Sequence, residues 1–244
     1  LVVMVIGGST MVIGGLRALR QTDLKLLLAY GTISQLGFMM LLLGVGEYHI
    51  AGAGLVLILA HAAFKAALFM VVGMIDHETG TREITELHGF GSSWRLVQVV
   101  AVVSAASMAG IPPLFGFVAK EKALDGYLEH GDFTGATAVL VVIVLASILT
   151  FAYSARFVPG VFGAFGDPDR PAVSRSANAP SAVFVGPSIV LTTATVVFGL
   201  VPGLLEAQYA CSPLVCVVSA AGRDHEGAGG FQDAPSLGMV RPVT

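Results

Sequence analysis

The stretch "GLVLILAHAAFKAALFMVVGMIDHETGTR", residues 54–82, decides the fold of this chain. Its apolar part is long enough for an α-helix that crosses a bilayer, which needs roughly 20 residues. Within that apolar part, His61 and Lys65 are the two side chains that ionise. They are four residues apart, so a helix places them on one face, one turn apart. The pattern predicts a membrane-spanning helix with an ionisable face.

The composition agrees with a chain that is solvated largely by lipid. Of its 244 residues, 55% are hydrophobic and 12% are charged, whereas a soluble domain carries about 25% charged residues. The formal net charge is −3, which gives no sign of a nucleic-acid partner. Cys211 and Cys216 are too few for a disulfide scaffold, and no histidine pair accompanies them at metal-ligand spacing. We therefore expect an integral membrane protein without a bound metal or cofactor.

Six apolar segments are long enough, or nearly so, to cross a membrane as helices. They are Leu1–Leu19, Leu26–Val45, Ile50–Ile75, Leu96–Ala119, Thr134–Val158 and Ala182–Val201. Residues 1–202 are thus predicted to form one all-α membrane domain, and the Gly-rich residues 203–244 a divergent, disordered tail. The chain begins inside an apolar run, so we interpret it as an internal piece of a longer protein or a product truncated at its start.

Basic residues concentrate in alternate connections between these segments. The odd-numbered connections carry Arg17, Arg20, Lys25, Arg82, Arg95, Arg156, Arg170 and Arg175. The even-numbered connections are more acidic and carry Glu47 and, beside Lys120 and Lys122, Asp125, Glu129 and Asp132. Because cytoplasmic loops are enriched in Lys and Arg, we expect the odd connections in the cytoplasm and residue 1 on the outer side.

The ionisable residues of the long apolar run are candidates for ion transport. A lysine near the centre of a bilayer costs about 2.5–3.5 kcal/mol on insertion scales. Such a cost persists where the group meets water, a partner or a transported ion, and both lysine and histidine can exchange protons. His61 and Lys65 are therefore candidate proton carriers. The alternative is a polar contact between helices that has no role in transport.

A second signal is "SMAGIPPLFGFVAKEKAL", residues 107–124. Pro112 and Pro113 remove backbone donors and clash with the preceding turn, so the helix is predicted to break near Gly110–Pro113. Transporters place ion sites at broken helices, whose open backbone lines cavities. Lys120 follows the break, and two interpretations remain open: a lysine that extends from a helix end to the interface, or a deeper residue in an ion path.

The stretch "RALRQTDLKLLLAYGTISQLGF", residues 17–38, supplies further polar groups. Asp23 is a candidate N-cap for the helix that follows it. Ser34 and Gln35 are polar groups within the next span, where they can contact another helix. The sequence shows no Ser-His-Asp arrangement, nucleotide-binding motif or Cys/His metal set, so enzyme chemistry is not expected.

Three stretches together resemble one family: "LRQTDLKLLLAYGTISQLGFM", "HAAFKAALFMVVGMIDHETGTR" and "AGIPPLFGFVAKEKAL". It is the family of proton-translocating, antiporter-like membrane subunits shared by respiratory complex I and the multisubunit Mrp-type Na+/H+ antiporters. "DHETGTR" and "GIPPLFGFVAKE" look most like the large A subunit of the Mrp antiporter. The resemblance runs to about Pro202 and implies the second inverted repeat of that fold, with one Pro-broken helix, plus a further helix.

The resemblance also implies roles for individual residues. Lys25 matches the lysine of a "DLK" motif, His61 and Lys65 match an "H-x-x-x-K" helix, and Lys120 matches the lysine of "GF-x-x-K-[DE]" on the broken helix. It implies that the proton-pathway residues are Lys120, His61, Lys65 and Lys25, supported by Asp23, Glu121, Ser34 and Gln35. Where some members carry a second histidine one turn before the first, this chain has Leu57.

The implied function is that of a membrane subunit in a multisubunit Na+(cation)/H+ antiporter of the bacterial plasma membrane. The implied partners are other antiporter subunits and lipid, the transported ions are protons and Na+, and no cofactor is implied. Two alternatives stay open: a proton-pumping subunit of complex I or of a membrane-bound hydrogenase, and an inactive truncated fragment. The first repeat of the family, which lies upstream, has no counterpart in this sequence.

Overall fold

The computed structural model describes residues 2–88, 90–131, 135–162 and 180–203, and this part of the chain is almost wholly helical. Its α-helices are α1 (Val2–Leu19), α2 (Leu24–Leu43), α3 (Tyr48–Thr79), α4 (Arg95–Ala109), α5 (Phe115–His130), α6 (Ala136–Val161) and α7 (Ala182–Leu200). A short 3-10 helix, Ser92–Trp94, leads into α4. Six helices in the described residues are long and apolar enough to cross a membrane. This confirms the predicted all-α membrane fold.

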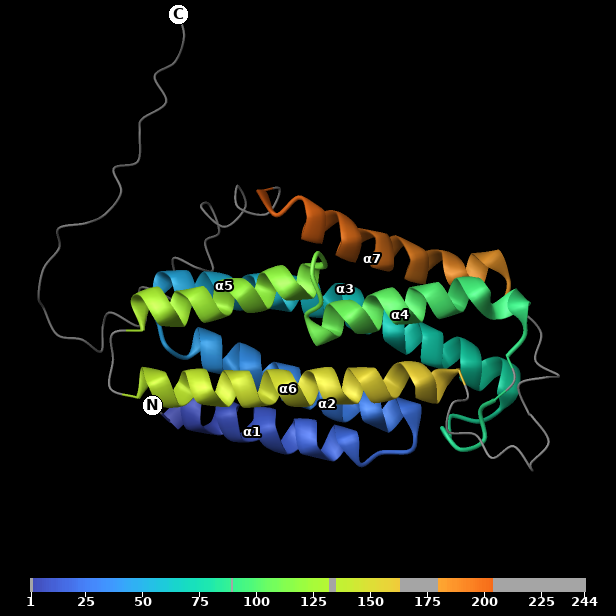
Figure 1. Cartoon of the computed structure of the whole chain (residues 1–244), viewed down its shortest axis with the longest axis horizontal. Coiled ribbons are helices and arrows are strands. Elements are labelled where there is room, and N and C mark those ends of the chain that lie inside the picture. Colours follow the sequence, from blue (N-terminus) through green and yellow to red (C-terminus); the bar gives the residue numbers. More distant parts are fainter. Residues whose placement is uncertain (1, 89, 132–134, 163–179, 204–244) are drawn as a thin grey trace, which may run out of the picture.

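The helices run roughly along a common direction, and α4 and α5 follow one another along the length of the molecule (Figure 1). The long helix α3 contacts α2, α4, α5 and α7, while α6 contacts α1, α2 and α4. Helix α3 is apolar along most of its length and buries fifteen of its residues. Because its neighbours cover it on several sides, Lys65 in the middle of α3 is buried within the helix bundle, and His61 one turn earlier is half-buried.

The first and third connections meet at one end of the molecule. The backbone nitrogen of Leu24 donates to the Arg82 oxygen, and that of Ile84 donates to the Thr22 oxygen, both at 3.0 Å. At the opposite end, the Tyr127 hydroxyl of α5 donates to the Leu41 carbonyl of α2. Among the described residues, the basic first and third connections thus lie together, opposite the end where α5 contacts the end of α2.

Glycines allow α1 and α2 to pack with their backbones in contact. A Cβ atom on Gly14 would lie 2.7 Å from the Ser34 nitrogen, and one on Gly37 would lie 2.6 Å from the Gly7 oxygen. Small residues at such spacing let membrane helices approach closely. This contact fixes the side of α2 that faces α1, and so leaves another side of α2 for α3 and α6.

The predicted break in the fourth segment is confirmed, but the predicted end of that segment is wrong. Helix α4 ends at Ala109, and Gly110 adopts a left-handed φ of 87°. Helix α5 then continues to His130, because Ala119, Ala123 and Tyr127 repeat at helical spacing and are buried. The residues assigned to a connection are therefore helical: Lys120, Lys122, Asp125 and Glu129.

Two further boundaries differ from the prediction. Helix α2 begins at Leu24, so Lys25 lies in its first turn and not in the preceding connection. Helix α3 continues past Ile75 to Thr79 and ends where Gly80 adopts a left-handed φ of 71°. The predicted tail lies outside the described residues from residue 204 onward.

Candidate functional site

Lys65 of α3 is buried, with 4% of its surface exposed, and reaches across to α2. Its Nζ donates a hydrogen bond of 2.9 Å to the Leu28 carbonyl oxygen, which also accepts one from the Thr32 hydroxyl. The Tyr153 ring of α6 lies 5.9 Å from the same nitrogen, within the range of a cation–π contact. Among the described residues, no carboxylate forms an ion pair with Lys65. The amine is thus held by neutral groups alone.

Gln35 connects α2 to α6 and shares a neighbour with Lys65, because both contact Tyr153. Its Nε2 donates to the Thr150 hydroxyl at 3.2 Å and to the Tyr153 hydroxyl at 3.4 Å. Its Oε1 is buried and has no hydrogen-bond partner within the described residues. Ser34 faces a different way, because its hydroxyl donates to the Met11 carbonyl of α1 at 2.7 Å. Ser34 and Gln35 therefore face different helices: Ser34 bonds to α1, and Gln35 bonds to the residues of α6 that include the Tyr153 ring near Lys65.

His61 lies one turn before Lys65 on α3. Its ring makes an edge contact with Phe64 at 5.6 Å between centroids, and its Nε2 is buried without a hydrogen-bond partner in the described part of the chain. The histidine borders an apolar pocket between α1, α2 and α3, which includes Leu36, Met39 and Ile58. The Nε2 of His61 is therefore available to form a hydrogen bond, either as donor or as acceptor.

Lys120 is the second buried lysine, with 8% of its surface exposed. Its Nζ donates to the carbonyl oxygens of Ala109 at 2.9 Å and of Met108 at 3.3 Å. These are the last residues of α4, where the break leaves carbonyls without helical partners and the helix dipole places partial negative charge. The side chain lies buried against the break, at the C-terminal end of α4. Of the two interpretations from the sequence, the structure supports the deeper position.

Other groups near the break hold its two half-helices together. The backbone nitrogen of Gly116 donates to the Ser107 hydroxyl at 3.0 Å, which connects α5 to α4. The hydroxyls of Ser104 and Thr192 are 2.9 Å apart and connect α4 to α7. A Cβ atom on Gly199 of α7 would overlap the backbone of the break. Helix α7 therefore packs directly against the broken segment.

The remaining predicted residues lie near the surface. Asp23 caps α2, as predicted, because its Oδ1 accepts a 2.9 Å hydrogen bond from the Leu26 nitrogen. Lys25 is exposed in the first turn of α2, and Glu121 is exposed on α5 beside the buried Lys120. The structure thus brings Lys65 and Gln35 to the same tyrosine, Tyr153. His61 lies one turn from Lys65, Lys120 lies at the break, and the other predicted residues lie apart.

The residues that the sequence analysis missed are polar partners from distant parts of the chain. They are Thr150, Tyr153, Ser104, Ser107 and Thr192. Hydroxyl residues are common in apolar helices, so nothing local in the sequence marks these positions. The charged stretch "DHETGTR", residues 76–82, does mark one tertiary contact. Its Arg82 forms ion pairs with Asp76 in the same stretch, at 3.5 Å, and with the distant Asp23, at 3.3 Å.

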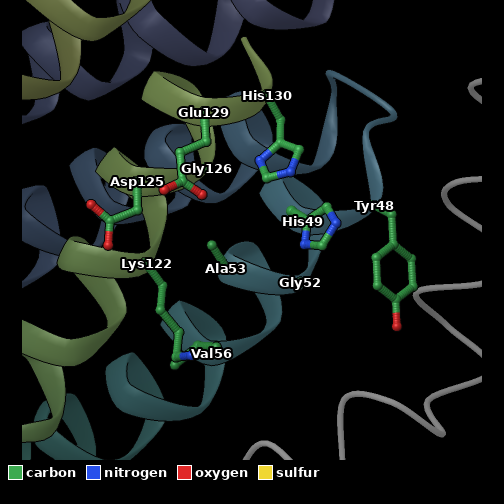
Figure 2. A pocket seen from close by; sticks show the side chains of 10 residues that line it. All are labelled: Tyr48, His49, Gly52, Ala53, Val56, Lys122, Asp125, Gly126, Glu129 and His130. Atoms are coloured by element: carbon green, nitrogen blue, oxygen red, sulfur yellow. The ribbon is translucent and has the colours of Figure 1, made fainter.

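An open pocket lies at the end of the bundle that holds the even connections (Figure 2). The rings of His49 and His130 stack there with centroids 4.1 Å apart, joining the start of α3 to the end of α5. Asp125 and Glu129, interpreted from the sequence as loop charges, border this pocket from α5 together with Lys122. No group of three or more His, Cys, Asp or Glu residues in the described ranges could hold a metal ion.

Comparison with known proteins identifies the family of this arrangement. A family model described as NADH:quinone oxidoreductase/Mrp antiporter, transmembrane, matches residues 1–149. Na(+)/H(+) antiporter subunit A1 of Staphylococcus haemolyticus is 39% identical over 233 residues, which cover 88% of this chain and 29% of that protein. The corresponding subunit of Staphylococcus epidermidis is 36% identical over 219 residues. The chain therefore spans less than a third of the length of these relatives.

Solved structures give the same result. A chain of the Mrp complex from Dietzia sp. DQ12-45-1b is 37% identical and superposes with a TM-score of 0.71, over 93% of this chain and 23% of that one. A chain of respiratory complex I from Thermus thermophilus has a TM-score of 0.73 at 22% identity, which shows a shared fold. With its apolar helices, the chain is a multi-pass membrane protein, and its bacterial relatives agree with the predicted plasma-membrane location. The chain belongs to the membrane-embedded family shared by NADH:quinone oxidoreductase and the Mrp antiporters.

Proposed function

We propose that this chain forms part of the proton pathway of a multisubunit Na+/H+ antiporter. The observation that carries the proposal is the pair of buried lysines, Lys65 and Lys120, whose hydrogen bonds within the described part of the chain go to backbone carbonyls. A buried ammonium without a carboxylate is costly, whereas a neutral amine is tolerated. Small changes in hydration or in neighbouring charge can therefore decide whether each amine carries its proton.

Lys120 is the central site of the proposed pathway, because a protonated amine there interacts with the negative end of the α4 dipole. His61 serves as a neutral relay through its unpartnered Nε2. A charge on Lys65 influences the protonation of neighbouring groups, because like charges disfavour one another at short range. In this proposal Lys25, which is exposed in the first turn of α2, exchanges protons with the cytoplasm.

The proposed partners are the other subunits of an antiporter complex, and the proposed ions are protons and Na+. The names of the relatives at 36–39% identity and the Mrp complex at 37% identity support this assignment. The likeness to complex I at 22% identity supports the fold alone, so a pumping role beside a redox arm is the second candidate. In either case the chain acts as a transporter subunit and not as an enzyme by itself.

The test is a Lys120→Ala substitution in the complete antiporter complex, assayed by sodium-driven pH change in inverted membrane vesicles. We expect exchange to fall at least tenfold. Lys122→Ala is the matched control, because Lys122 lies on the same helix two residues later and borders the open pocket at the end of the bundle. Undiminished exchange in the Lys120 variant, with the complex assembled, contradicts the proposal.

A further inference from the structure

We infer that Gln35 is a second docking position for the Lys65 amine. The amine then moves along α2 between two acceptors, the Leu28 carbonyl oxygen and the Gln35 amide oxygen. This inference rests on the proposed function, in which Lys65 takes part in the proton pathway. It assigns to Gln35, Tyr153 and Gly31 a role in positioning the lysine.

The amine lies over a gap that Gly31 leaves on the surface of α2. A Cβ atom on Gly31 would be 3.0 Å from the Lys65 Nζ and 3.1 Å from a ring carbon of Tyr153. Leu28, Gly31 and Gln35 are spaced by three and four residues, so they share one face of the helix. The amine therefore has one acceptor a turn before the gap and a second polar residue a turn after it.

The second acceptor lacks a donor. The Oε1 of Gln35 is fully buried and has no hydrogen-bond partner among the described residues. A buried acceptor without a donor is destabilising, so its presence needs an explanation. Lys65 has three N–H donors, and its hydrogen bond in this structure goes to Leu28. The Lys65 amine, which can donate further hydrogen bonds, thus lies at Gly31, and the Gln35 amide oxygen, an acceptor without a partner among the described residues, lies one turn further along α2.

Helix α6 fixes the orientation of the Gln35 amide. The amide nitrogen has two N–H donors, and it donates to the hydroxyls of Thr150 and Tyr153. The amide oxygen is consequently turned away from those hydroxyls and remains open to another donor. The Tyr153 ring, whose edge borders the gap at Gly31, also lies within cation–π range of the amine. Tyr153 thus contacts both the lysine and the glutamine.

The experiment compares two substitutions of Gln35 in the complete antiporter complex, again through sodium-driven pH change in inverted vesicles. Gln35→Leu removes the acceptor at similar volume, and we expect exchange to fall about tenfold at every pH. Gln35→Glu keeps an acceptor but adds a carboxylate that favours the protonated lysine. We therefore expect the pH profile of Gln35→Glu to move to more alkaline values, where the lysine can again release its proton.

Two further variants make the result decisive. Ser154→Ala is the control, because Ser154 is also buried on α6 and, among the described residues, its hydroxyl donates within that helix, to the Thr150 carbonyl. We expect its rate and pH profile to be unchanged. Lys65→Met is the reference for the proposed function. If Lys65→Met leaves exchange intact, Lys65 has no role in transport and both the proposed role and this inference fail.

If Lys65→Met stops exchange while both Gln35 variants keep the normal rate and pH profile, this inference alone is overturned. A merely structural role for Gln35 would lower the amount of assembled complex without moving the pH profile. Should Gln35→Leu fail to assemble, Gln35→Glu decides, because it keeps the size and polarity of the side chain. An unchanged pH profile in that variant overturns the inference.

Discussion

The two buried lysines bind similar groups in different settings. Lys120 donates to carbonyls at the end of α4, which the break leaves without helical partners. Lys65 donates to the Leu28 carbonyl inside the continuous helix α2, where a threonine hydroxyl competes for the same oxygen. A helix break can therefore bind a lysine amine through the backbone carbonyls that it leaves free. An intact helix needs additional side chains, here the Tyr153 ring and Gln35.

The largest expected effect is a difference in protein stability between a variant of Lys120 and a variant of Lys65. Lys120→Ala leaves two buried carbonyls without a donor, which should lower the free energy of unfolding by about 1–3 kcal/mol. Lys65→Met replaces a buried amine that has no carboxylate partner among the described residues with an apolar side chain, so the change should be neutral or stabilising. Thermal unfolding of the two purified variants in detergent measures the difference. Equal destabilisation would show that the break gives Lys120 no special support.

The second prediction concerns the glycine at the break. Gly110→Ala adds a side chain at a φ of 87°, and its Cβ would lie 2.9 Å from the Lys120 Cδ. We expect a loss of about 1–2 kcal/mol from backbone strain, together with displacement of the lysine. Gly80→Ala is the control, because its φ is 71° and its Cβ would meet no atom within 4 Å. Exchange activity should fall in the first variant and persist in the second.

A smaller effect is expected at the site in the intact helix. Tyr153→Phe keeps the ring near Lys65 but removes the hydroxyl that accepts from Gln35. The expected cost is about 1 kcal/mol, the usual contribution of one hydrogen bond. Denaturation in detergent measures it, with Tyr153→Leu as the comparison that also removes the ring. A larger loss for Phe than for Leu would contradict the proposed role of the ring.

The smallest effect should come from a cation at the end of the bundle. Arg82 pairs with Asp23 and Asp76, but about a third of its side chain is exposed. Exposed ion pairs contribute at most about 1 kcal/mol and weaken with salt. Arg82→Gln should therefore cost only a few tenths of a kcal/mol, and less at high salt. Salt-independent destabilisation would point to a role of Arg82 in packing.

Sequence reasoning succeeded where the cause is local. The apolar runs predicted the membrane helices, the prolines predicted the break after α4, and Asp23 was identified as the cap of α2. The spacing of His61 and Lys65 placed both on one face of α3. Each of these follows from residues within a few positions of one another, so helix geometry alone fixes the outcome.

The contacts that complete the site could not be predicted in this way. Gln35 meets Thr150 across 115 positions of the chain, and Ser104 meets Thr192 across 88. Which hydroxyl faces which helix depends on tertiary packing, and a lone Ser or Thr in an apolar helix gives no hint of it. The prediction for the end of α5 was also wrong. Lys122, Asp125 and Glu129 were interpreted as a charged loop, but they belong to the helix and border an open pocket.

The backbone link between the first and third connections limits how α2 and α3 can move. Two hydrogen bonds, Leu24 to Arg82 and Ile84 to Thr22, join the start of α2 to the segment just after α3. Sliding of one helix along the other would break both bonds and the ion pair of Arg82 with Asp23. The register between the helix that carries Lys65 and the helix that carries its acceptors is therefore locked at that end. In the proposed pathway, proton transfer at Lys65 would use side-chain motion within a fixed frame.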